Sequence, residues 1–280
     1  MQETIITPED GILSIRHSIR NMRKNASLTW ELATRMFIRD MRAMYRQSIL
    51  GYIWIFLPPI ANTLIWVYLN SQDVIKVDTG GISYPAFVLT GNLLWTAFNA
   101  TLTSMLNTVN ESRALLSKIN FPHEALLLTA LGKSAVNAML PLVILIPVLP
   151  FYVNEFHATM LLFPLGVIVM ILFGATIAIL LLPIATLYGD VSRGVQLILK
   201  FGFFVTPVVY PLPAAGLAKF ISDVNPVTPL LVTSRSWLLG EGPIMLQPFI
   251  LLSIITLIAL CFAILAYKIA VPYLIERLSS

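Results

Sequence analysis

The stretch that decides the fold runs Trp30-Glu-Leu-Ala-Thr-Arg-Met-Phe-Ile-Arg-Asp-Met-Arg-Ala-Met-Tyr-Arg-Gln-Ser-Ile-Leu-Gly-Tyr-Ile-Trp54 and leads directly into an apolar run that ends near Leu69. Four arginines in this stretch recur at helical spacing and fall within an arc of roughly 60° on a helix: Arg35, Arg39, Arg42 and Arg46. The far side of the same helix carries Trp30, Phe37, Met41, Met44 and Tyr45. The pattern predicts a helix that lies flat at a membrane surface, with its arginines toward phosphate groups. Gly51 marks the corner at which the chain turns into the bilayer.

The composition indicates a polytopic, all-α membrane protein. Of the 280 residues, 57% are apolar and only 11% are charged, and the mean hydropathy is +0.82. A soluble domain carries about 25% charged residues. The polar residues are therefore too few to coat a soluble domain of this length. Because residues 1–29 contain no short apolar core before a cleavage site, we expect the first span to serve as the insertion signal.

Six apolar stretches have roughly the 20 residues that a bilayer core requires. The expected spans are Tyr52–Leu69, Tyr84–Leu106, Ala125–Val148, Met160–Leu187, Val195–Leu212 and Pro248–Tyr267. The resulting domain plan has a cytosolic tail at 1–29, an amphipathic interface helix at 30–50, a six-span domain at 51–270 and a second cytosolic tail at 271–280.

The positive charges predict the orientation of these spans. With this plan, fifteen of the 18 Lys and Arg residues lie on one side, and only Lys76, Lys219 and Arg235 lie on the other. Positive residues concentrate on the cytosolic side. We therefore expect both termini in the cytosol and the chain in the cytoplasmic (inner) membrane.

The external segment 213–247 is too long for a hairpin and too apolar for a solvated loop. Its apolar stretches Leu217–Ile221 and Pro229–Leu239 are too short to cross a membrane, and prolines interrupt it repeatedly. We interpret it as a pair of short re-entrant helices, because backbone of this kind survives at membrane depth only when it is buried in protein or lines a cavity. An interfacial lid without a role in transport is the alternative.

Several kinds of chemistry are not expected of this chain. Gly132-Lys133-Ser134 matches the end of a phosphate-binding loop, but that motif needs a glycine where Leu127 stands. The three histidines lack metal-ligand spacing, and the acidic residues lie in loops and at span ends. We therefore expect no catalytic residues, no metal, no bound cofactor and no nucleic-acid partner. The centres of the spans carry no ionisable relay either, so energy for transport would have to come from another subunit.

Four stretches together resemble the ABC-2 type permeases that export polysaccharides. They are Tyr45–Pro59 around the start of the first span, Leu116–Glu124 between spans two and three, Gly189–Arg193 running on to Thr206–Pro211, and Asn225–Thr228 followed by Arg235–Gly240. One departure is Gly189, which stands where many members have an arginine. The resemblance covers about residues 30–270.

The resemblance implies partners and a substrate. It implies a homodimer driven by two copies of a separate ATPase subunit, which would bind ATP and Mg. It implies export of a lipid-linked, O-antigen-like polysaccharide. Export of capsular polysaccharide or teichoic acid, a small-lipid or drug exporter, and a membrane enzyme acting on lipid-linked sugars remain as alternatives.

The residue patterns and the resemblance together indicate the candidate site residues. The four arginines either anchor the helix to anionic lipid, or contact the pyrophosphate or headgroup of the substrate, or contact the ATPase. The loop after the second span either is a solvated hairpin or docks on the ATPase through Glu111, Arg113, Lys118, Phe121 and Pro122. Aromatic faces that let a sugar chain slide would come from Tyr52, Trp54, Phe203, Phe204 and Tyr210. The alternative is that these aromatic residues belong to the membrane-interface belt or to the core. The external re-entrant gate would contain Asn225, Pro226, Arg235 and Trp237.

Overall fold

The protein is described by a computed structural model that places residues 11–44, 48–111, 124–153, 156–242 and 244–279. Side chains are described for residues 27–44, 48–109, 124–153, 156–242 and 244–271. Within these ranges every regular element is helical: α1 (Gly11–Met44), α2 (Ile53–Ser71), α3 (Tyr84–Glu111), α5 (Glu124–Met139), η1 (Leu140–Ile144), α6 (Leu145–Tyr152), η2 (Ala158–Leu162), α7 (Phe163–Leu187), α8 (Gly189–Val205), α9 (Gly216–Val224), α10 (Val227–Leu239) and α11 (Leu246–Ser279).

Helices α3 and α7 form the centre of the bundle. Helix α3 packs against α7, α5, α2, α10 and α8, and α7 also packs against α11 and α10. Small residues permit the close approaches. A methyl group added at Gly166 of α7 would lie 2.6 Å from Cβ of Ser234 in α10, and one added at Gly174 would lie 2.9 Å from the carbonyl oxygen of Phe98 in α3. Glycine at such crossings is typical of membrane helices, which associate by close packing.

Four helical stretches are long and apolar enough to cross a bilayer: residues 53–71, 124–152, 158–187 and 246–271. The other two stretches predicted as spans are helical as well. Helix α3 has 28 residues but carries several polar side chains, and α8 has 17 residues. The described residues therefore confirm an all-helical chain with several helices fit to span a membrane, and the count of six stays a prediction.

Prolines explain two differences from the predicted boundaries. The third stretch is interrupted by the 3₁₀ segment η1, which has Pro141 in its first turn, because proline removes a helical hydrogen-bond donor. The fifth helix ends at Val205 and not at Leu212. Thr206 precedes Pro207 and has extended backbone angles (φ −87°, ψ 139°), as expected for a residue before proline.

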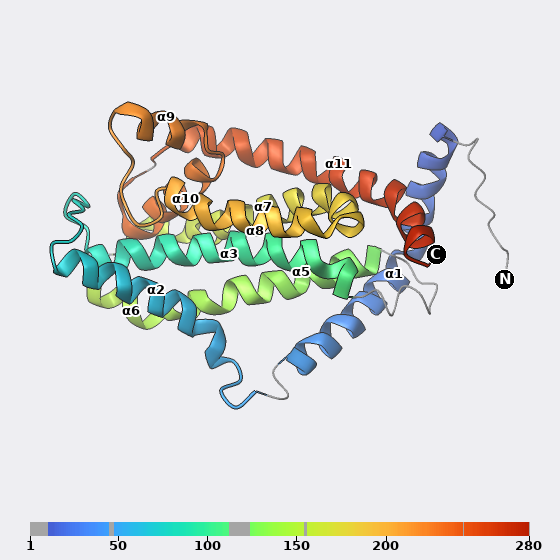
Figure 1. The fold of residues 1–280 in the computed structure, drawn as a ribbon, viewed down its shortest axis with the longest axis horizontal. Coiled ribbons are helices and arrows are strands. Elements are labelled where there is room, and N and C mark those ends of the chain that lie inside the picture. Colours follow the sequence, from blue (N-terminus) through green and yellow to red (C-terminus); the bar gives the residue numbers. More distant parts are fainter. Residues whose placement is uncertain (1–10, 45–47, 112–123, 154–155, 243, 280) are drawn as a thin grey trace.

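Helix α1 runs continuously from Gly11 to Met44, across the boundary at residue 29 that the domain plan expects. Its face toward α5 is made of Thr29, Ala33 and Met36, which are buried, whereas Trp30 is 67% exposed. Figure 1 shows α1 and the C-terminal part of α11 at one end of the bundle and α9 at the opposite end. The described helices at the two predicted cytosolic termini thus lie at the opposite end of the bundle from α9, which is predicted to be external.

Candidate functional site

The arginines of α1 differ in how they are paired. Arg35 forms an exposed i,i+4 ion pair with Glu31 at 2.7 Å. Arg39 donates through Nε and Nη2 to Oδ1 of Asp40, at 2.9 and 2.7 Å. Arg42 is exposed and makes no ion pair with any described residue. Arg42 is therefore the arginine of this set whose guanidinium is available to an outside phosphate, while Arg46 lies outside the described residues.

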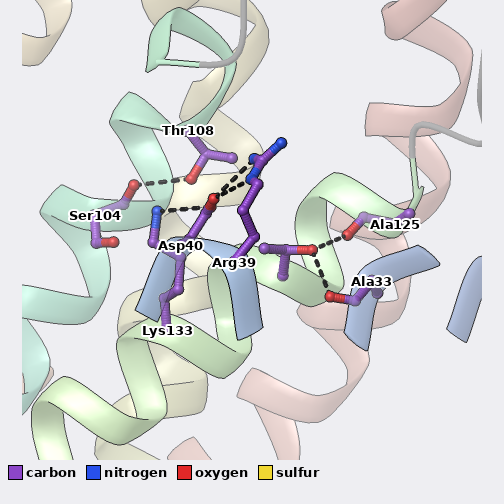
Figure 2. Close-up of polar contacts among 8 residues, drawn as sticks. Ala33, Arg39, Asp40, Ser104, Thr108, Ala125 and Lys133 are labelled. Carbon is purple, nitrogen blue, oxygen red and sulfur yellow. Dashed lines mark hydrogen bonds and ion pairs between the residues drawn. The ribbon is translucent and has the colours of Figure 1, made fainter. Parts of the chain in front are cut away.

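Asp40 connects α1 to α5 as well as to Arg39. Its second carboxylate oxygen lies 3.4 Å from Nζ of Lys133, and both side chains are largely shielded, with 23% and 16% of their surface exposed. Figure 2 shows Asp40 between Arg39 and Lys133, with Thr108 and Ser104 of α3 beside them. Lys133, which the sequence analysis noted in Gly132-Lys133-Ser134, is thus paired with a carboxylate of the same chain.

Two further contacts hold α1 against α5. The hydroxyl of Thr129 donates to a backbone carbonyl and lies 3.2 Å from the carbonyl oxygen of Ala33 in α1 and 2.7 Å from that of Ala125 in α5 (Figure 2). The ring of Phe37 packs on Gly132, where an added methyl group would lie 3.3 Å away. Backbone, packing and charge therefore join α1 to α5 along one face.

Helix α5 is also joined to the last helix. Nζ of Lys268 in α11 lies 3.0 Å from Oε1 of Glu124, the first residue of α5. The stretch 112–123, which contains Arg113, Lys118, Phe121 and Pro122 of the expected coupling loop, lies outside the described residues. Glu111 ends α3, and its side chain is also outside the described set. Helix α5, which follows this stretch, is thus joined by ion pairs to both α1 and α11.

Aromatic side chains gather where α2, α3 and α8 meet. The ring of Trp66 in α2 lies 6.3 Å from that of Phe203 and 6.4 Å from that of Phe204 in α8. The ring of Trp95 in α3 also lies near Phe203, with centroids 6.1 Å apart. The cluster continues through α3 to α7, because Phe98 lies 5.5 Å from Trp95 and stacks on Phe173 at 5.8 Å.

The predicted path residues divide into two groups. Phe203, Phe204 and Tyr210 lie together, since the Tyr210 hydroxyl donates to the carbonyl oxygen of Phe204 at 2.9 Å. Tyr52 and Trp54 are exposed and lie around the N-terminus of α2, about 18–21 Å along the helix axis from Trp66 at 1.5 Å per residue. The structure therefore does not bring the two groups into contact within one chain.

Helices α2 and α8 share a second property, which is that each leaves apolar side chains uncovered. Only 11% of the α2 span is buried. Large apolar side chains that are exposed on these two helices are Ile53, Trp54, Leu57, Ile60, Leu64, Ile65, Tyr68, Leu197, Ile198, Phe201, Phe204 and Val205. A single chain does not cover these faces, so lipid or another chain has to.

A polar cluster that the sequence analysis did not identify joins α2 to α3. The amide of Asn92, which is 3% exposed, donates to the carbonyl oxygen of Pro59 at 2.9 Å and to the Thr63 hydroxyl at 3.4 Å. Asn62 in turn donates to the Asn92 side-chain oxygen at 3.0 Å. Asparagine within an apolar helix was the available signal, because such residues hydrogen-bond across helix pairs in membranes.

The residues assigned to the external gate occupy both ends of α10. Asn225 accepts a hydrogen bond from the Val227 backbone N–H at 3.0 Å, which forms an Asx turn just before the helix, and its amide donates to the Thr206 hydroxyl at 2.8 Å. Pro226 is exposed at the start of the helix. Trp237 is 3% exposed and packs edge-on against Phe249 of α11, with ring centroids 4.9 Å apart.

Arg235 is the most unusual of these residues because it is a buried cation, 2% exposed. Its Nη1 donates to the backbone carbonyl oxygens of Pro207 and Val208, at 2.8 and 3.2 Å. Its guanidinium carbon lies 3.6 Å from the ring centroid of Phe87 in α3. Burial lowers the pKa of Arg235 to about 9, and the negative charge of Glu241 acts in the opposite direction. The guanidinium therefore remains charged at neutral pH.

Comparison with known proteins places the chain in a family. The family profile of the ABC-2 type transporter matches residues 31–239. The chain belongs to the ABC-2 type transporter family.

Individual relatives carry more particular descriptions. The chain is 26% identical over 201 residues to the O-antigen export system permease protein RfbA of Myxococcus xanthus, covering 71% of this chain and 76% of the relative. It is 23% identical over 221 residues to the protein of the same name in Klebsiella pneumoniae, covering 76% and 82%. It is 21% identical over 182 residues to the polysialic acid transport protein KpsM of Escherichia coli, covering 63% and 69%.

Proposed function

We propose that this chain is the membrane-spanning permease subunit of an exporter that moves a lipid-linked, O-antigen-like polysaccharide across the cytoplasmic membrane. The observation that carries the proposal is the match to the ABC-2 type transporter family over residues 31–239, together with relatives described as O-antigen export permeases. Capsular polysaccharide is the second candidate substrate, favoured by the similarity to KpsM. Energy would come from ATP and Mg bound by a separate ATPase subunit.

The proposed topology has six spans, with α3 and α8 as the second and the fifth. Both termini are cytosolic, and α9 and α10 form the external re-entrant pair. The gathering of α1 and the end of α11 at one end of the bundle, opposite α9, supports this arrangement (Figure 1). The exposed apolar residues Leu217 and Phe220 on α9 fit a helix that lies at a membrane interface.

The proposed assembly contains two copies of this chain and two copies of the ATPase. The uncovered apolar faces of α2 and α8 support pairing of two permeases around a path between them. The aromatic side chains of α8 would line the path, because flat rings contact sugar C–H groups without fixing one register. Tyr52 and Trp54 lie far from Phe203 within one chain, so they would line the path at a different depth in the membrane.

The proposed coupling route enters through the stretch before α5. Motion delivered there by the ATPase reaches Glu124 at the start of α5 and, through Lys133 and Lys268, both α1 and α11. Among the arginines of α1, Arg42 is best placed to contact the pyrophosphate or headgroup of the substrate, because Arg35 and Arg39 already have carboxylate partners.

The decisive experiment is reconstitution in lipid vesicles. The permease, its ATPase and a fluorescent lipid-linked glycan are combined, and glycan that crosses the bilayer is measured with a sugar-specific lectin. Movement should require ATP and both proteins, and it should stop when the ATPase cannot hydrolyse ATP. Glycan movement by the permease alone would refute the proposal and favour a membrane enzyme or flippase that needs no partner.

A further inference from the structure

The segment 206–209, between α8 and α9, is buried although it is not helical. Thr206 and Val208 are completely buried, and Val209 is 3% exposed. Backbone groups in such a segment need partners, because an unpaired buried carbonyl or amide is costly, and more so where no water reaches it. The hydrogen-bond donors for these backbone groups therefore show which helices hold the segment in place.

Three consecutive carbonyl groups of this segment accept hydrogen bonds from side chains of other helices. Pro207 and Val208 accept from Nη1 of Arg235 in α10, and Val209 accepts from the Tyr84 hydroxyl of α3 at 3.3 Å. The outer end of α8 is therefore attached to α10 and α3 mainly through side chains. Side-chain attachments of this kind can be broken without unfolding a helix.

The charged guanidinium of Arg235 is surrounded by a ring and by carbonyl groups, and no acidic side chain of the described residues contacts it. Its guanidinium lies over the Phe87 ring, and no carboxylate of the described residues comes within ion-pair distance of it. Its Nε is buried and has no hydrogen-bond partner among the described residues. A planar cation over a ring and beside carbonyl dipoles is stabilised by these contacts, but less completely than by a carboxylate.

Gly91 makes this close contact possible. A methyl group at that position would lie 2.2 Å from the Val208 carbonyl oxygen and 3.4 Å from Nη1 of Arg235. Phe87 and Gly91 are four residues apart and thus share one face of α3. That face supplies both the ring beneath the guanidinium and the space for the carbonyl that it binds.

We propose that Arg235 is a latch that holds the outer end of α8 closed against α10 and α3 and releases the carbonyls of Pro207 and Val208 during each export cycle. The resting contacts of Arg235 stand by themselves, whereas the export cycle, the outer side of the membrane and the position of α8 beside the path rest on the proposed function. Arg235 acts as a positioning residue, because it contacts the chain that would line the path and not the substrate.

The test measures how fast a buried thiol is labelled. Val208→Cys is introduced into a protein in which Cys261, the one cysteine of the sequence, is replaced by alanine. A water-soluble maleimide then reports exposure of the segment. In nanodiscs without any ATPase, Arg235→Met should increase the labelling rate by about tenfold or more, because local opening no longer has to break two hydrogen bonds. Arg193→Met, at an exposed arginine of α8, is the matched control and should leave the rate unchanged.

Two further arms keep the test decisive. Phe87→Leu removes the ring but leaves the hydrogen bonds of Arg235, so it should raise the labelling rate by roughly threefold. This variant tests the contact independently if Arg235→Met does not fold. With Arg235 in place and the protein in lipid vesicles, where export can be measured, the labelling rate should also rise when ATPase, ATP and lipid-linked glycan are added together, which a static attachment would not produce.

The outcomes separate the latch from the proposed function. If Arg235→Met and Phe87→Leu both leave the labelling rate unchanged, in protein that elutes as a folded species, the role of the arginine is overturned. If the protein with Arg235 in place exports glycan but its labelling rate does not rise during export, the opening step is overturned and the proposed function stands. Absence of export with a raised rate for Arg235→Met would count against the proposed function and against release during export, while the resting contact would stand.

Discussion

Replacing Gly91 with alanine should destabilise the protein although alanine is the better helix former. The added methyl group would lie 2.2 Å from the carbonyl oxygen and 3.1 Å from the carbonyl carbon of Val208. Ordinary contact between carbon and oxygen needs about 1 Å more than the shorter of these distances. Both sides of the contact are backbone, and the carbonyl is held by Arg235, so no flexible side chain can move to relieve it.

The expected loss follows from two opposing effects. Overpacking in a well-filled interior costs ~1–3 kcal/mol, and a contact between two backbones belongs at the upper end of that range. Alanine in place of glycine within a helix gains up to ~1 kcal/mol. The net loss in the free energy of unfolding should therefore be about 2 kcal/mol.

A matched glycine is available on α8. Gly194 is inside that helix, and an added methyl group would meet no atom within 4 Å. Gly194→Ala should therefore be neutral or stabilise by up to ~1 kcal/mol. The two variants make the same chemical change and should differ by about 3 kcal/mol.

The assay is unfolding by sodium dodecyl sulfate in mixed micelles, followed by circular dichroism, with wild type and both variants titrated in parallel. A Gly91→Ala protein as stable as wild type would show that α3 and the 206–209 segment are not in contact as described. Equal destabilisation of both variants would show that the effect is not steric.

Three other substitutions test the remaining contacts. Lys133→Met should lower the free energy of unfolding by about 1 kcal/mol, because it leaves Asp40 without its partner on α5 in a partly shielded site, whereas Lys133→Arg should retain most of it; equal stability of both variants would contradict a charge contact there. Asn92→Leu should cost about 1–2 kcal/mol in the same titration, since it removes the hydrogen bonds between α2 and α3, and a more stable variant would contradict that attachment. Arg42→Gln should reduce glycan export at normal protein levels more than Arg35→Gln does, because Arg35 is already ion-paired. Wild-type export by both variants would show that these arginines only anchor α1 to the membrane.

Much of the fold could be predicted from the sequence because a bilayer restricts the possibilities. Helices are the way for an apolar chain of this kind to satisfy its backbone groups in lipid, so long apolar stretches predict helices with little ambiguity. The stretch Tyr52–Leu69 became α2 within two residues at each end, and the apolar stretch beginning at Pro229 became α10, which ends at Leu239 as predicted. Helical periodicity also placed Arg35, Arg39 and Arg42 in one exposed row.

The partners of the polar side chains could not be predicted in the same way. Asp40 and Lys133 are 93 residues apart, and Arg235 and Val208 are 27 apart, so neither pair leaves a periodic signal. Prediction of the fifth span at Val195–Leu212 was wrong at its end, because the helix ends at Val205 and the chain continues as a buried segment of turns and bends. Hydropathy measures burial and does not distinguish a helix from a segment held by side chains.

The sequence by itself determined that this is a helical membrane protein, which of its stretches are basic and where its short helices between α8 and α11 lie, because composition and period act locally. Only the tertiary structure decided which polar groups meet: Asp40 with Lys133, Asn92 with the α2 backbone, and Arg235 with the carbonyls that follow α8. The physical reason is that an apolar surrounding makes every unpaired polar group costly. Each such group must therefore find its partner in space, wherever that partner lies in the chain.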